Sequence, residues 1–207
     1  MSDCCGDKNL NVQHESQRRT LIIVLILNAL MFGIVFYAGW YAKSSALLSE
    51  SLDYLGDSLT YILSFIVINM GMKMKARVAI FKGLLILAAG MVVAWQIVEK
   101  LLHPSVPLFE VMGIFSFLGL LVNGLCLYLL TKHKEEDINM SSVWECSRND
   151  IAAGMAVFIS AFGVWLTNSM WPDLVVAFAL MILFFRSAFS VLIRSYREYQ
   201  SHTPDCC

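Results

Sequence analysis

Residues 46–70, ALLSESLDYLGDSLTYILSFIVINM, decide the fold of this chain. Most side chains in this stretch are apolar, and about 20 such residues are enough for a helix to cross a bilayer. Asp53 and Asp57 nevertheless lie in the middle of it. Inserting one aspartate at the centre of a membrane helix costs about 2.5–3.5 kcal/mol. Two of them therefore indicate a function rather than a packing role.

A polar stripe runs along one side of this expected helix. The spacing of four residues places the Asp53 and Asp57 carboxylates on the same face. At roughly 100° per residue, several small or hydroxylated residues fall within about 60° of Asp53. These residues are Ser49, Gly56, Thr60 and Ser64. A stripe of this kind is expected to face a bundle interior or a water-filled path rather than lipid.

The composition is that of a membrane protein. Only 15% of the 207 residues are charged and 58% are hydrophobic, whereas soluble domains carry about 25% charged residues. Apolar runs of spanning length cover residues 20–42, 46–70, 78–100, 108–131, 142–167 and 172–194. We predict an all-α integral membrane protein with a bundle of six transmembrane helices over residues 19–197. Residues 1–18 and 198–207 are expected to form short tails.

The placement of lysine and arginine predicts the orientation. With six crossings, both tails and the connections at 71–77 and 132–141 lie on one side of the membrane, and these segments are rich in basic residues. The opposite side holds only Lys43 and Lys100 near its connections. By the positive-inside rule, both termini are expected to be cytoplasmic. The membrane that the chain crosses is expected to be the plasma (inner) membrane. The net charge of −1 gives no indication of a nucleic-acid partner.

The second expected part of the site lies in residues 142–167. Asp150 follows Cys146 by four residues, which repeats the geometry of Asp53 and Asp57, and Asn149 lies on the same face. If this helix neighbours the one at 46–70, three carboxylates and one thiolate converge. Four such ligands suit a tetrahedral Zn²⁺, and the thiolate favours softer ions such as Cd²⁺.

Less specific interpretations of these residues remain open. A single cysteine in a membrane helix is commonly a small packing residue, which is the alternative for Cys146. Two aspartates on one face also suit Na⁺ binding or a proton relay. Ser49, Thr60 and Asn149 are expected around the ligands rather than among them.

Several segments, in this order and spacing, resemble the cation diffusion facilitator family. The segments are Gly39–Leu48 followed by Asp53 and Asp57, Val98–Pro104, Gly119–Asn123, Asn139–Trp144 followed by Cys146 and Asp150, and Trp171–Asp173. The resemblance implies that Asp53, Asp57, Cys146 and Asp150 form the transport site, and it implies a homodimer and proton-coupled export of Zn²⁺ and related ions. Position 146 is commonly His in the family. The chain resembles a short form without the family's C-terminal cytoplasmic domain.

The function expected from the sequence is efflux of a divalent cation, Zn²⁺ or Cd²⁺, by antiport with protons, without enzyme activity and without a resident cofactor. The expected partners are the metal ion, protons, the lipid bilayer and a second copy of the chain. Two rival hypotheses are a passive cation channel and a non-transporting protein, either a metal sensor or a subunit that partners a full-length homologue. A channel would need several weak sites along a pore rather than one compact cluster.

The chain also carries two pairs of adjacent cysteines near its ends. Because the cytoplasm is reducing, these cysteines are not expected to form disulfides. Cys4, Cys5, Cys206 and Cys207 are therefore candidates for capturing a soft metal ion at the cytoplasmic entrance. The alternative is that short terminal segments tolerate almost any residue.

Overall fold

The computed structural model describes residues 4–67, 72–131 and 138–201, and it describes side chains for 18–62, 80–131, 144 and 147–193. These residues form six helices and no strand, which confirms the predicted all-α class. The helices are α1 (Cys4–Ala42), α2 (Ser45–Val67), α3 (Met72–Leu102), α4 (Phe109–Thr131), α5 (Ile138–Thr167) and α6 (Trp171–Ser201).

Several helices extend beyond the apolar runs that predict them. The first begins at Cys4, so most of the segment expected to be a tail continues α1 as helix. The fifth helix begins at Ile138 rather than at 142, and the sixth continues to Ser201 rather than 194. The extensions of α1 and α6 contain Glu, Gln and Arg, which have high helix propensity. Hydropathy therefore located the membrane-spanning part of each helix but not its ends.

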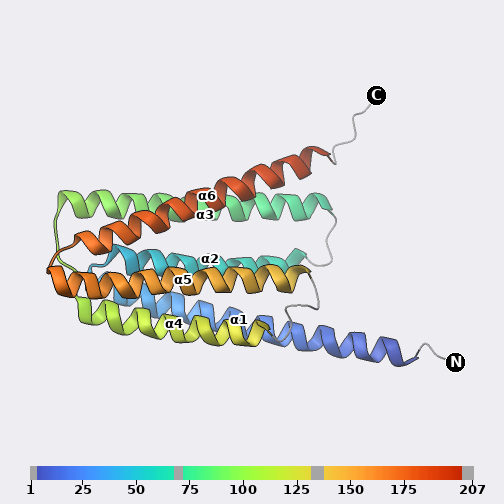
Figure 1. Ribbon diagram of the computed structural model, residues 1–207. Helices are drawn as coiled ribbons and strands as arrows, with labels where there is room; N and C mark the ends of the chain where they lie inside the picture. Colours follow the sequence, from blue (N-terminus) through green and yellow to red (C-terminus); the bar gives the residue numbers. More distant parts are fainter. Residues whose placement is uncertain (1–3, 68–71, 132–137, 202–207) are drawn as a thin grey trace.

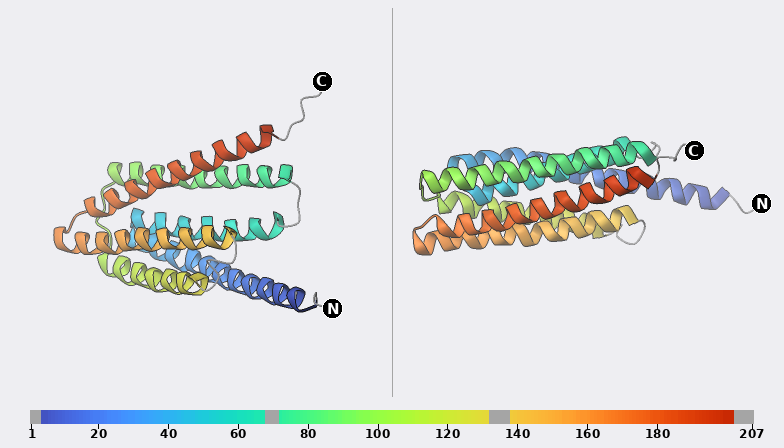
Figure 2. Two further views of the ribbon diagram at one scale, coloured as in Figure 1. Left: turned by 45° about the vertical axis from the view of Figure 1, so that its right-hand side comes forward. Right: turned by 90° about the horizontal axis from the view of Figure 1, so that it is seen from above.

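The helices pack mainly in three pairs, α1 with α2, α4 with α5, and α3 with α6. The α3–α6 pair lies against α2 and α5, on the side away from α1 and α4 (Figures 1 and 2). In Figure 1 the start of α1 and the end of α6 lie at the same end of the bundle. An even number of crossings requires this arrangement.

Within the described residues, five of the helices are long and apolar enough to cross a membrane, namely α1, α3, α4, α5 and α6. The exception, α2, carries Glu50, Asp53 and Asp57 within two turns. Its 23 residues still extend for about 35 Å, more than the roughly 30 Å of a hydrocarbon core. Because α2 contacts α1, α3, α5 and α6, its polar face lies inside the bundle. We therefore assign α2 as the sixth crossing.

A tight turn joins α1 to α2. Lys43 adopts a left-handed φ of 53°, and the backbone N–H groups of Lys43 and Ser44 donate to the carbonyls of Trp40 and Gly39. These two bonds are the Schellman arrangement that ends many helices. A Cβ at Gly39 would lie 2.9 Å from the Leu48 backbone nitrogen, so only glycine permits this approach of the two helices.

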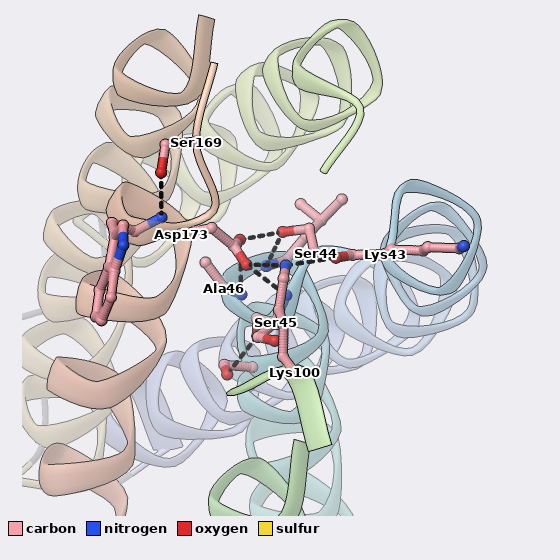
Figure 3. Close-up of polar contacts among 10 residues, drawn as sticks. Lys43, Ser44, Ser45, Ala46, Lys100, Ser169 and Asp173 are labelled. Atoms are coloured by element: carbon pink, nitrogen blue, oxygen red, sulfur yellow. Dashed lines mark hydrogen bonds and ion pairs between the residues drawn. The ribbon is translucent and has the colours of Figure 1, made fainter. Parts of the chain in front are cut away.

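A buried ion pair fixes the start of α2 to α3 and α6 (Figure 3). Lys100 Nζ of α3 lies 2.7 Å from Asp173 Oδ2 of α6, and both side chains are almost fully buried. The Asp173 carboxylate also accepts hydrogen bonds from Ser44 Oγ and from the backbone N–H groups of Ser45 and Ala46. A carboxylate at a helix N-terminus satisfies free N–H groups and stabilises the helix dipole. Asp173 therefore holds α2 in a fixed position relative to α3 and α6.

Candidate metal site between helices α2 and α5

The two acidic helix faces predicted from the sequence meet in the structure. Helices α2 and α5 contact each other, and the side chains of Asp57 and Asp150 are joined by a hydrogen bond. Both side chains are partly buried within the bundle. The condition stated for the site, that the helices expected at 46–70 and 142–167 are neighbours, is therefore met.

Asp53 lies one turn before Asp57 on α2 and interacts electrostatically with both Asp57 and Asp150. Within the described part of the chain, however, no three His, Cys, Asp or Glu side chains lie close enough together to hold a metal ion. The side chain of Cys146 falls outside the described residues. The set of Asp53, Asp57, Cys146 and Asp150 as four ligands stays a prediction.

A cysteine of α4 closes one side of this region. The Cys126 side chain is buried and interacts electrostatically with Asp57 and Asp150. It packs in a cluster with Val24, Tyr61 and Leu130. These contacts favour a packing role, as part of an apolar wall beside the two carboxylates.

Of the three residues expected around the ligands, Ser49 and Thr60 form hydrogen bonds within α2, whereas Asn149 is exposed. Ser49 Oγ donates to the carbonyl of Ser45 at 2.7 Å, and Thr60 Oγ1 donates to the carbonyl of Gly56 at 2.8 Å. Hydroxyl groups in helix interiors commonly bond in this way to the preceding turn. Asn149 is exposed and lies about 100° from Asp150 around the helix, so its expected place beside the ligands stays a prediction.

One acidic residue of this region was not singled out in the sequence. Glu50 of α2 is only 3% exposed, and it interacts electrostatically with Asp53. Its spacing of three residues from Asp53 and seven from Asp57 places all three on one helix face. That spacing is the feature of the sequence from which Glu50 could have been predicted as part of the site. Glu50 is, however, the sixth residue of α2, where an acid commonly occurs without a functional role.

The four cysteines expected to capture a metal ion have side chains outside the described part of the structure. Cys4 and Cys5 are the first residues of α1, but their side chains, like Cys206 and Cys207, lie outside the described residues. Their role in metal capture stays a prediction.

A comparison with known protein families identifies the transmembrane unit. Residues 21–198 match the model of the cation efflux transmembrane domain. The chain belongs to the cation efflux family. This membership confirms the resemblance to cation diffusion facilitators, and the match includes both helices that carry the acidic residues.

Curated relatives of this cation efflux protein are distant. It is 22% identical over 203 residues to the zinc transporter ZitB of Yersinia pestis, which covers 92% of this chain and 65% of the relative. It is 19% identical over 209 residues to the cadmium, cobalt and zinc/H(+)-K(+) antiporter of Bacillus subtilis (strain 168), covering 94% and 67%. The chain thus spans about two thirds of the length of the curated relatives that it matches.

Proposed function

We propose that this protein exports a divalent cation, Zn²⁺ or Cd²⁺, in exchange for protons, through a site between α2 and α5. The observation that carries the proposal is the contact of Asp57 with Asp150 across these helices. Family membership supports it, as do the names of the zinc transporter and antiporter relatives. In this proposal Asp53, Asp57, Cys146 and Asp150 bind the ion, both termini are cytoplasmic, and the chain works as a homodimer.

The energetics of moving charge support exchange of the metal ion with protons. Moving two positive charges out of a cell at about −100 mV costs about 4.6 kcal/mol, and each entering proton returns about 2.3 kcal/mol. Carboxylate and thiolate ligands must be deprotonated to bind a metal ion, so metal and protons compete for the same atoms. Binding from the cytoplasm and release at the other side are then coupled through one site.

Alternating access requires the helices around the site to move. The site lies within the group of α1, α2, α4 and α5, whereas α3 and α6 form a separate pair beside it. Rocking of such units against each other is the usual way in which transporters expose a central site to each side in turn. The hydrogen bonds that Asp173 of α6 accepts at the start of α2 join the two units at the end opposite the termini, so we place the pivot there.

Transport by the purified full chain in liposomes tests this function. With a zinc-sensitive dye and a pH-sensitive dye inside, added Zn²⁺ should enter while protons leave, and a pH gradient should change the rate. A passive channel would conduct Zn²⁺ without proton movement. A metal sensor or partner subunit would bind Zn²⁺ without any uptake.

Ion preference is expected to depend on the residue at position 146. In Cys146→His, an imidazole nitrogen replaces the thiolate, which should shift preference from Cd²⁺ toward Zn²⁺. We expect the Cd²⁺-to-Zn²⁺ ratio of initial rates to fall by roughly tenfold, a difference of about 1.4 kcal/mol in relative binding. Cys126→Ser serves as the matched control, since Cys126 is assigned a packing role. An unchanged ratio in Cys146→His would mean that Cys146 is also a packing residue.

A further inference from the structure

Glu50 is a buried acid that has no cationic partner in the described part of the chain. Its side chain is 3% exposed, and its Oε2 atom has no hydrogen-bond partner among the described residues. The ion pair of Lys100 with Asp173 is the one salt bridge found in the described part of the chain, and it does not involve Glu50. A buried oxygen that is left without a partner costs about 1–3 kcal/mol, so a position of this kind needs a compensating partner.

The surroundings of Glu50 are built to accommodate its carboxylate. Tyr54 of α2 donates a hydrogen bond from its hydroxyl to Glu50 Oε1 at 3.4 Å. A Cβ at Gly119 of α4 would lie 2.8 Å from this oxygen, and one at Gly154 of α5 would lie 3.3 Å from it. The carboxylate therefore occupies space that two glycines leave open on the neighbouring helices. One of its oxygens is held by Tyr54 and the other is free to bind.

Glu50 also lies in line with the acids of the proposed transport site. Glu50, Asp53 and Asp57 follow one face of α2 and cover about 10 Å along the helix axis. Electrostatic interactions connect Glu50 with Asp53, and Asp53 with Asp57 and Asp150. Since α2 begins at the end of the bundle opposite the termini, Glu50 lies beyond Asp57 in that direction.

We propose that Glu50 Oε2, together with Asp53, forms a second binding position for a divalent cation between the Asp57–Asp150 contact and the end of the bundle opposite the termini. The position rests on the proposed function, because it would receive the ion that leaves the first site. An ion passing in that direction meets carboxylate oxygen at each step, since Asp53 is shared between the two positions.

Equilibrium binding of Zn²⁺ to the purified full chain tests this position directly. Asp57→Asn weakens the first site, and the binding that remains in this variant is expected at Glu50 and Asp53. Adding Glu50→Gln should then weaken the remaining Zn²⁺ affinity by at least the roughly 10–100-fold that is typical of losing a residue that only supports a metal ligand. Glutamine has nearly the same size and keeps an oxygen for the Tyr54 hydroxyl. Ser51→Ala in the same Asp57→Asn background is the matched control, since the Ser51 hydroxyl donates to the carbonyl of Leu48 and to no acid, and it should retain the affinity within about twofold.

Transport supplies a second measurement. Glu50→Gln alone should lower the initial Zn²⁺ rate in liposomes by about tenfold or more while Zn²⁺ affinity at the first site stays within about twofold, since Asp57 and Asp150 are intact. Glu50→Asp, which keeps the charge, should recover part of the rate. Equal Zn²⁺ affinities of Asp57→Asn with and without Glu50→Gln would overturn the second position. Failure of the parent to transport Zn²⁺ would instead refute the proposed function, and the binding comparison would still decide on Glu50.

Discussion

Asp57→Asn is expected to abolish Zn²⁺ transport while the protein remains folded. Asparagine keeps the size of the side chain and can still hydrogen bond to Asp150, but it removes one negative charge from the meeting point of α2 and α5. Removing one member of a buried charged group commonly costs about 2–5 kcal/mol of binding. A loss near 3 kcal/mol corresponds to an affinity reduced by more than about a hundredfold. The measurements are Zn²⁺ binding in detergent and the initial uptake rate in liposomes.

Ser58→Ala provides the matched control for this prediction. Ser58 is the next residue along α2, is buried, and donates its hydroxyl hydrogen bond to the carbonyl of Tyr54 rather than to an acid. Its loss should leave transport within about twofold of the parent, because one helical back-bond contributes little. Near-normal Zn²⁺ uptake by Asp57→Asn would show that the acids between α2 and α5 are not the transport site.

The sequence was sufficient for the fold class because bilayer thickness imposes a strong constraint. Any segment that crosses the bilayer must satisfy its backbone groups internally and expose apolar side chains to lipid. Six apolar runs therefore predicted the spanning parts of six helices. The polar beginning of α1 and end of α6 carry no such constraint, so hydropathy could not locate those helix ends.

The sequence predicted the candidate metal site only on the condition that the two helices that carry its residues are neighbours. The spacing of Asp53 with Asp57 and of Cys146 with Asp150 follows from helix geometry alone. Whether the two helices touch depends on how all six pack, and a pattern within one helix contains no information on its neighbours. The structure supplies that contact through Asp57 and Asp150.

The pairing and burial of charged residues near helix ends were the features that the sequence predicted least well. In the sequence Lys100 counted as one of two basic residues on the outer side, and Asp173 as part of a helix start. Their pairing depends on α3 and α6 lying side by side over the first turn of α2. Glu50 was missed for the same reason, because its burial results from α4 and α5 and not from its own helix.

The second large effect is expected from Asp173→Ala, which should destabilise the protein by about 3–5 kcal/mol, the usual cost of breaking a buried ion pair from one side. The substitution leaves Lys100 buried without its partner and removes the acceptor for Ser44 Oγ and for two backbone N–H groups of α2. Among the described residues, Lys100 Nζ would keep its hydrogen bond to the carbonyl of Lys43. The free energy of unfolding can be measured by denaturant titration of the purified protein in mixed micelles.

A double-mutant cycle with Lys100→Met separates the ion pair from the capping of α2. Methionine removes the charge and keeps most of the length of the apolar stem, so the double variant should be less destabilised than the sum of the two single variants. The difference measures the coupling between the two charges, and the destabilisation that remains reflects the lost hydrogen bonds to Ser44, Ser45 and Ala46. Ser169→Ala is the control in the adjoining turn, since Ser169 Oγ accepts an exposed hydrogen bond from the Trp171 N–H and does not contact the ion pair. A stability of Asp173→Ala equal to that of Ser169→Ala would contradict the role of Asp173 in fixing α2.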